Sequence, residues 1–259
     1  MSILSHDSFW NAVISLPTTK KMLQLSLSKC GACGRTILEA ALDDYVGKTD
    51  EKCRCGGLYS LIIGFWIDFL RRSLSLRREK IEKLLADPYA RRAIITLVRS
   101  FTHFGIKKPL SIYSPFLVVW DFTHKCNLSC KHCYSNSGVT RQTELTTEEA
   151  LEVVDQLADA GVIALAFSGG EPLSRKDFFE VASHAAKRGL YVSVATNGTL
   201  LTKENVRKLK EAKINYVEVS IDGATAKTHD SFRGVPRAFD KAVAGLKNCG
   251  AGAPFSSYS

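Results

Sequence analysis

Three cysteines in one short loop are the residues of this chain best suited to chemistry. Cys126, Cys130 and Cys133 have the spacing Cys-x-x-x-Cys-x-x-Cys. Three thiolates this close in sequence can hold three corners of a cubic iron–sulfur cluster and leave its fourth iron open to a small molecule, whereas a cluster that only transfers electrons usually has four cysteine ligands. Taken alone, the triplet leaves a second hypothesis open, a zinc site completed by His124 or His132.

A glycine-rich turn follows the cysteine loop at Ser168-Gly-Gly-Glu-Pro172. Gly169 and Gly170 let the backbone approach a ligand closely, Glu171 can accept a hydrogen bond from an ammonium group, and Pro172 rigidifies the turn. An ordinary glycine turn is the alternative when this motif is considered in isolation.

Polar side chains recur at two later positions. Asn197 lies in the turn Thr196-Asn-Gly-Thr199, which an ordinary Asn-Gly turn explains nearly as well. Ser220 and Asp222 share one face of an expected strand at period two. Arg233 follows in Ser-Phe-Arg-Gly, where a solvated surface position is an equal alternative.

These motifs alternate with segments whose patterns predict strands and helices. Short apolar runs rich in β-branched and aromatic residues predict strands, and helical spacing with capping residues predicts the helices between them. The expected strands are 116–122, 162–167, 191–195 and 216–221, and the expected helices are 146–161, 176–187, 203–212 and 237–247. Such alternation predicts an α/β fold with a parallel sheet, in which all the motifs fall at the carboxyl ends of strands, where barrels of this kind have their active sites.

The motifs together resemble those of the radical S-adenosylmethionine (radical SAM) enzymes. The cysteine spacing, the aromatic His132 before the last cysteine, Tyr134 after it and the later Gly-Gly-Glu-Pro sequence all match that family's pattern. The nearest group includes molybdenum-cofactor, haem-pathway and peptide-modifying enzymes. The resemblance implies a 4Fe-4S cluster whose open iron binds S-adenosylmethionine, and a 5′-deoxyadenosyl radical that abstracts hydrogen from a substrate.

The resemblance also assigns roles to individual residues. Gly169, Gly170, Glu171 and Pro172 are expected to hold the amino group of the cofactor's methionine part. Ser220 and Asp222 are expected at its ribose and carboxylate, with Arg233 and Asn197 as weaker candidates. A reductant such as ferredoxin or flavodoxin is implied as a partner.

A partial (β/α)6 barrel is expected, because the family core normally has six βα units. The sequence has about four, and 254–259 could open a fifth strand. We therefore expect a core that is incomplete at its C-terminus. This raises a non-catalytic alternative, a metal-binding adaptor or inactive truncated core. For an active enzyme the substrate is unknown; a peptide or protein is slightly favoured over a tetrapyrrole or pterin pathway intermediate.

A second cysteine group lies near the N-terminus. Cys30 and Cys33, and Cys53 and Cys55, are two close pairs, each followed by glycine, and they resemble a zinc ribbon holding one metal with four thiolates. Because the second pair is Cys-x-Cys, an auxiliary iron–sulfur cluster or partly free thiols are the alternatives. A helix is expected over 35–46, between the pairs.

Composition limits the remaining interpretation. The chain has 259 residues, 45% of them hydrophobic, and a net charge of +9. The segment 71–108 holds eleven basic and three acidic residues, so an anionic partner and a simple solvated face are equal alternatives for it. We expect a zinc-ribbon-like module over 1–60, a basic helical linker over 61–112 and the radical SAM core over 113–259. No signal peptide or transmembrane segment is recognised, and clustered cysteines favour the reducing cytoplasm.

Overall fold

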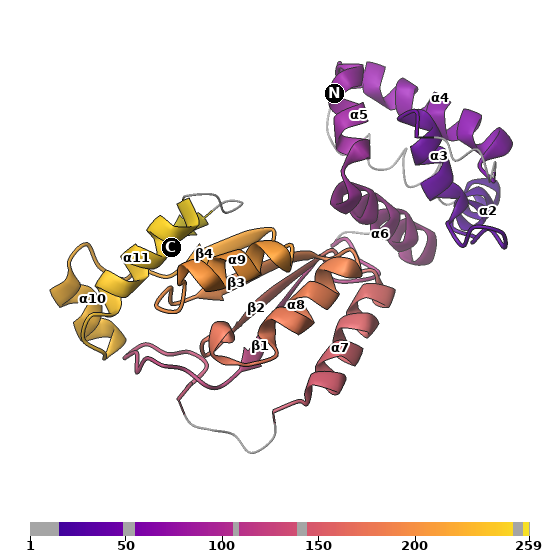
Figure 1. The fold of residues 1–259 in the computed structure, drawn as a ribbon. Helices are drawn as coiled ribbons and strands as arrows, with labels where there is room; N and C mark the ends of the chain where they lie inside the picture. Colours follow the sequence, from indigo (N-terminus) through magenta and orange to yellow (C-terminus); the bar gives the residue numbers. More distant parts are fainter. Residues whose placement is uncertain (1–15, 49–54, 106–108, 139–143, 251–255, 259) are drawn as a thin grey trace. The chain divides into compact units, whose positions relative to one another are not determined.

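The computed structural model describes residues 16–48, 55–105, 109–138, 144–250 and 256–258. The chain forms two compact units, Met1–Pro115 and Phe116–Ser259 (Figure 1). The second unit, called here the core unit, carries the three-cysteine loop, and the first is called the N-terminal unit.

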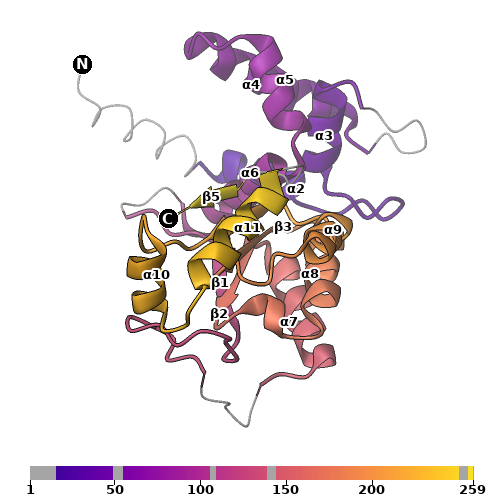
Figure 2. The same ribbon diagram turned by 60° about the vertical axis from the view of Figure 1, so that its left-hand side comes forward.

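The core unit is built on a parallel sheet whose strand order follows the sequence, β1-β2-β3-β4-β5. The strands are β1 (Leu117–Thr123), β2 (Ala164–Gly169), β3 (Tyr191–Thr196), β4 (Tyr216–Val219) and β5 (Ser256–Tyr258). The intervening helices are α7 (Thr147–Ala160), α8 (Phe178–Lys187), α9 (Lys203–Glu211), α10 (Ala226–Arg233) and α11 (Ala238–Gly250). Helices α7, α8 and α9 cover one face of the sheet (Figures 1 and 2).

Side-chain alternation explains this arrangement. In β3 every second residue is buried, Val192 and Val194 among them, so one face of the strand enters the core between sheet and helices. Phe167 of β2 and Phe178 of α8 are fully buried, with ring centroids 5.5 Å apart in an edge-to-face arrangement. Helix α7 begins at a reciprocal Thr146–Glu149 capping box, as its sequence predicts.

The predicted α/β fold and partial barrel are confirmed. All four expected strands and all four expected helices are present, and β5 pairs in parallel with β4 as the fifth strand. Helix α10 is not predicted by the sequence pattern. This short helix buries polar side chains, His229 and Arg233, so it has no apolar stripe from which it could have been recognised.

The N-terminal unit consists of helices. They are α2 (Pro17–Ser26), α3 (Ile37–Tyr45), α4 (Gly57–Ser73), α5 (Arg78–Ala86) and α6 (Pro88–Phe104). Leu38 and Leu42 of α3 pack with Leu85 of α5 and Ile95 of α6 in one small core. The sequence predicts separate segments over 1–60 and 61–112, whereas the structure packs helices from both segments around this common core.

The apolar spacing from Ile67 to Leu85 predicts one continuous helix, and this is wrong. The helix breaks after Ser73, and Ser75 takes a left-handed backbone conformation with φ 53°. The Leu76 amide then donates to the Arg71 carbonyl and closes the end of α4. Among the described helices, none is long and apolar enough to cross a membrane.

Candidate cofactor site

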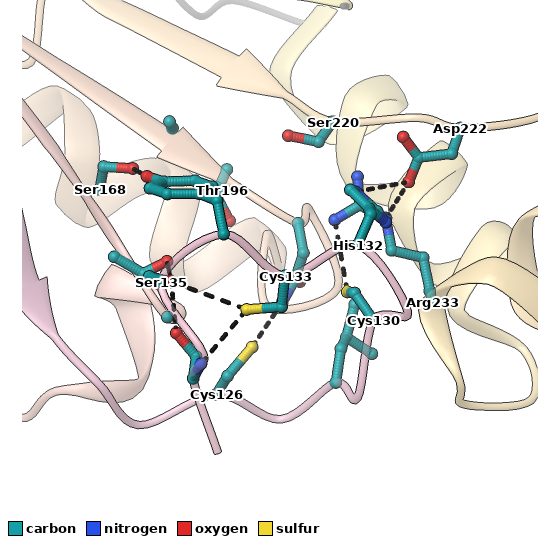
Figure 3. Close-up of a pocket in the computed structure, with 17 residues that line it drawn as sticks. Cys126, Cys130, His132, Cys133, Ser135, Ser168, Thr196, Ser220, Asp222 and Arg233 are labelled. Atoms are coloured by element: carbon teal, nitrogen blue, oxygen red, sulfur yellow. Dashed lines mark hydrogen bonds and ion pairs between the residues drawn. The ribbon is translucent and has the colours of Figure 1, made fainter. Parts of the chain in front are cut away.

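The motifs of the core unit surround one cavity of about 320 Å³. Its walls come from the cysteine loop after β1, the ends of β2, β3 and β4, and α10 (Figure 3). The expected site residues on the wall are Cys126, Cys130, Cys133, Gly169, Gly170, Asn197, Ser220, Asp222 and Arg233. Chain direction explains the convergence, because the carboxyl ends of parallel strands meet at one edge of a sheet.

Backbone hydrogen bonds attach the cysteine loop to the end of α10. The amides of Ser129 and Lys131 donate to the carbonyls of Arg233 and Phe232, at 3.1 and 3.0 Å. The chain passes so close here that a Cβ at Gly234, where φ is +75°, would collide with the Ser129 carbonyl oxygen. The His132 ring stacks on Phe232 with centroids 4.3 Å apart. Helix α10, missed from the sequence, therefore positions the cysteines.

The two glycines of the Gly-Gly-Glu-Pro turn bring that turn against the same loop. The Gly170 amide donates to the Thr123 carbonyl at 2.7 Å, and the Glu171 amide donates to the Lys125 carbonyl at 2.8 Å. A Cβ at Gly170 would collide with that Lys125 carbonyl. The motif predicts that these glycines let the backbone approach a ligand closely; the structure shows that they also permit close approach to the cysteine loop.

The sulfur atoms lie among hydrogen-bond donors. Burial raises the pKa of the Cys133 thiol, but hydrogen bonds from the Ser137 amide and from the hydroxyls of Ser135 and Ser137 outweigh it, so the net pKa is lowered. The Ser137 amide lies 3.2 Å from Cys133 Sγ. Burial raises the pKa of Cys126 above its usual value. The Arg233 guanidinium lies 3.7 Å from Cys130 Sγ. Donors and one cation facing three thiols suit a thiolate-bound, anionic cluster.

Charged side chains form the part of the wall beside Cys130 (Figure 3). Arg233 is only 8% exposed and forms an ion pair with Asp222, whose carboxylate also lies 3.8 Å from His132 Nε2 (Figure 3). Arg233 is therefore not the solvated surface residue that was its alternative. Ser220 lies beside Asp222 on the wall, as the period-two spacing predicts.

Glu171 lies behind the cavity wall and is completely buried. Its carboxylate accepts hydrogen bonds from the Thr196 hydroxyl at 2.7 Å and from the backbone amides of Asn197 at 2.8 Å and Leu173 at 3.2 Å. Burial raises its pKa, and these hydrogen bonds oppose the rise. Pro172 is also buried and begins a short 3-10 turn. Neither side chain lines the cavity, so both support the wall.

Asn197 connects this support to the cysteine loop. Its side-chain amide donates to Asn127 Oδ1 at 2.8 Å and lies 4.0 Å from Cys126 Sγ. Its own Oδ1 accepts hydrogen bonds from the amide and the hydroxyl of Thr199. A buried carboxylate thus fixes the Asn197 backbone, and the Asn197 side chain fixes the residue next to the first cysteine.

Comparison with known proteins agrees with this geometry. Residues 120–252 match the radical SAM superfamily. The chain belongs to that superfamily. It is 48% identical over 135 residues to an AdoMet-dependent heme synthase of Methanosarcina barkeri, covering 52% of this chain and 39% of that protein. It is 37% identical over 138 residues to a mycofactocin maturase of Mycobacterium tuberculosis, covering 53% and 35%.

A solved structure with a similar fold is Streptococcus suis SuiB bound to its precursor peptide SuiA. The TM-score is 0.57 at 17% identity, with 85% of this chain and 49% of that chain covered. This likeness concerns the fold. The chain spans about two fifths or less of the length of the two relatives compared above.

Several residues at this cavity were not singled out from the sequence. Thr196, Ser135 and Ser137 line the cavity, and Ser168 does so while its hydroxyl lies 3.0 Å from that of Tyr134. His229 is completely buried, and its Nδ1 accepts the Asp222 amide at 3.2 Å. Thr196 and Ser168 were inside recognised motifs, and Ser135 and Ser137 could have been noticed because they closely follow Cys133; His229 offered no signal.

The N-terminal cysteines lie in the other unit. Cys30, Cys33 and Cys55 come together, with the three sulfur atoms all within 4.8 Å of one another. Cys53 lies outside the described residues, and its part in a four-thiolate zinc site stays a prediction from the sequence. The expected helix between the pairs is present as α3.

Proposed function

We propose that the core unit holds a 4Fe-4S cluster through Cys126, Cys130 and Cys133 and starts radical chemistry on S-adenosylmethionine bound beside it. The observation that carries the proposal is that all three cysteines of one loop line the same cavity as the Gly169-Gly170 backbone. When bound, cluster and cofactor would supply a 5′-deoxyadenosyl radical able to abstract hydrogen.

The residues of the chain would bind and orient that cofactor. The backbone of Gly169 and Gly170 would accept hydrogen bonds from its amino group, and Arg233 would attract its carboxylate. Ser220 and Asp222 would contact the ribose hydroxyls. Glu171 and Asn197 would act as positioning residues, because their polar atoms are already engaged by Thr196, Leu173, Thr199 and Asn127.

A small reductant protein such as ferredoxin or flavodoxin would supply the electron, and a reducing compartment such as the cytoplasm suits the thiolates.

For the substrate we favour a tetrapyrrole. Relatives named heme synthase, Fe-coproporphyrin III synthase and pre-heme d1 synthase share 48%, 46% and 41% identity with this chain over 135, 134 and 134 residues. A peptide, slightly favoured from the sequence, is the second candidate and is supported by the mycofactocin maturase relatives at 37%. The basic segment 71–108 suits an anionic partner of either kind, since tetrapyrrole carboxylates and acidic peptides are both negatively charged.

The test begins with the cofactor. The chain, reconstituted anaerobically with iron and sulfide and then reduced, should show a paramagnetic cluster spectrum that changes when S-adenosylmethionine is added. Asp222→Asn and Arg233→Lys should raise the cofactor concentration needed for that change by about tenfold, the effect of losing one charge-assisted contact. Cys249→Ser is the matched control, because Cys249 is a buried thiol of α11 that does not line the cavity.

The substrate is tested separately. Fe-coproporphyrin III should quench the tryptophan fluorescence of the reconstituted chain at lower concentrations than an acidic peptide of equal charge does. Tighter binding of the peptide would reverse the order of the two substrates. A spectrum that S-adenosylmethionine leaves unchanged at saturation would contradict the cofactor proposal itself and favour the adaptor.

A further inference from the structure

A second group of three cysteine sulfurs lies in the N-terminal unit, whereas the proposed radical site belongs to the core unit. The geometry points to a mononuclear, tetrahedral zinc centre ligated by Cys30, Cys33 and Cys55, and not to an auxiliary iron–sulfur cluster. The sequence leaves these two hypotheses open, and the distances between the sulfur atoms distinguish them.

The separations fit ligands that share one ion. Cys33 Sγ and Cys55 Sγ lie 3.7 Å apart, and all three sulfurs lie within 4.8 Å of one another. Zinc–sulfur bonds of about 2.3 Å in a tetrahedron place neighbouring sulfurs about 3.8 Å apart. The Cys33–Cys55 separation therefore matches this value, and Cys30 Sγ lies close enough for all three sulfurs to share one ion.

The cysteines of the core unit provide an internal comparison. In the part of the chain that the structure describes, only the N-terminal three sulfurs meet this 4.8 Å condition, and Cys126, Cys130 and Cys133 do not. In a cubic cluster each cysteine binds a different iron, which keeps the sulfurs farther apart than a shared ion does. The same chain thus presents two different sulfur arrangements, one wide and one narrow.

A tight hairpin forms the first half of the narrow site. Lys29 and Thr36 pair as an antiparallel bridge, and between them the Cys30 amide donates to the Arg35 carbonyl at 2.7 Å. The Gly34 amide donates to the Cys30 carbonyl at 2.8 Å, with Gly34 at a φ of +71°, which favours glycine. This turn places both thiols on the same side before a metal binds.

The second half comes from the start of α4. Cys55 lies two residues before Gly57, the first residue of α4, and Cys33 lies four residues before Ile37, the first residue of α3. Metal binding would join the starts of both helices, where amide groups and the helix dipole stabilise negative charge. Three thiolates around one divalent ion carry a net negative charge, which these helix starts would stabilise.

Zinc is the ion that this donor set selects. Thiolates in a tetrahedron suit zinc or iron, and zinc binds such sites more tightly than ferrous iron does. Zinc has no redox chemistry, so the centre would hold α3 and α4 together and would not relay electrons to the core unit.

The test uses the full chain with Cys126, Cys130 and Cys133 replaced by alanine, so that any remaining metal is bound elsewhere. Purified anaerobically with iron and zinc both supplied, this variant should contain about one zinc per chain. Further replacement, Cys30→Ser with Cys33→Ser, should lower the zinc content at least about tenfold. The matched control is Cys249→Ser, which should not change it.

X-ray absorption is measured on the triple-alanine variant, in which Cys30, Cys33 and Cys55 are unchanged. Its result therefore does not depend on whether the serine variants fold. The metal of the triple-alanine variant should show a sulfur shell at about 2.3 Å and no metal–metal scattering. Stoichiometric iron with sulfide, a metal–metal distance, zinc retained without Cys30 and Cys33, or no bound metal would each overturn the proposal.

Discussion

The two units of this chain bury their apolar residues to very different extents. In the core unit, one continuous cluster runs from Phe122 to Cys249 between the sheet and its helices. In the N-terminal unit, the described core contains four buried hydrophobic residues, and α4 contributes none of them. Leu58, Leu61 and Phe65 of α4 are all about two thirds exposed or more. A unit with so small a core generally needs a metal, a partner or a neighbouring domain for its stability.

The units also differ in where their charged and titratable side chains lie. The core unit buries Glu171, His229 and Arg233 beside its cavity, where they hold loops in place. The N-terminal unit instead joins its helices through Asp43, which pairs with Arg35 and Arg91 at positions more open to solvent. Buried polar groups that fix geometry are typical of functional sites, which supports the proposal that the chemistry belongs to the core unit.

The largest expected effect separates the two metal sites. Replacing Cys126, Cys130 and Cys133 together by alanine should abolish reductive cleavage of S-adenosylmethionine, because nothing then holds the cluster, and should leave the zinc content unchanged. Chromatography of 5′-deoxyadenosine and metal analysis of the same sample measure both outcomes. If zinc is lost together with the cluster, the two sites are not independent.

A pair of phenylalanine substitutions tests the contrast in burial. Phe178→Ala should lower the free energy of unfolding of the core unit by about 3–5 kcal/mol, because Phe178 is fully buried in an aromatic cluster. Phe65→Ala, at a side chain that is 67% exposed, should change it by about 0.5 kcal/mol or less. Hydrogen exchange followed peptide by peptide reports each unit separately. A cost above about 1 kcal/mol at Phe65 would show that the face of α4 is covered in solution.

A pair of glycine substitutions tests how closely each metal loop is packed. Gly170→Ala should destabilise the core unit by about 1–3 kcal/mol and lower its cluster content, because the new Cβ would collide with the Lys125 carbonyl beside Cys126. Gly31→Ala lies between two ligands of the other site, where a Cβ meets nothing within 4 Å, and should leave zinc content unchanged. Equal losses of metal from both variants would mean that loop packing does not distinguish the sites.

The sequence was sufficient for features that depend on local pattern. Alternating apolar residues predicted the strands, and cysteine spacing predicted that Cys126, Cys130 and Cys133 line one cavity and that Cys30, Cys33 and Cys55 come together. Features set by contacts between distant segments were not predictable. The helix break at Ser75 is not visible in the apolar spacing, which continues past it. Helix α10 is not visible either, because the side chains that it buries are polar.

The orientation of Glu171 is the clearest of these cases. The motif predicts a carboxylate that faces the cofactor, but its direction depends on Thr196 and Asn197 at the end of β3. Those residues follow it by about twenty-five positions and become its neighbours only when β2 and β3 pair.

The smallest expected effect concerns that same buried carboxylate and is a pH dependence. Burial raises the pKa of Glu171 in the folded chain, so the folded state binds its proton more tightly than the unfolded state does. Its contribution to stability is therefore fully present below the pH at which an unfolded glutamate titrates, and it is lost as pH rises through the higher folded pKa. Glu171→Gln removes this titration while keeping an oxygen that can accept from Thr196 or Asn197.

The difference in the free energy of unfolding, wild type minus Glu171→Gln, should consequently fall as the pH rises from the pKa of an unfolded glutamate to the higher pKa of Glu171 in the folded chain. Denaturant unfolding of the apo chain at a series of pH values measures it, and Glu180→Gln on α8 serves as a control at a carboxyl that is not buried. The opposite slope would mean that the hydrogen bonds from Thr196, Asn197 and Leu173 outweigh burial and that the carboxylate is held ionised. Glu171 would then present a negative charge behind the cavity wall, and electrostatic attraction of the cofactor's ammonium group, rather than support of the wall alone, would become part of its role.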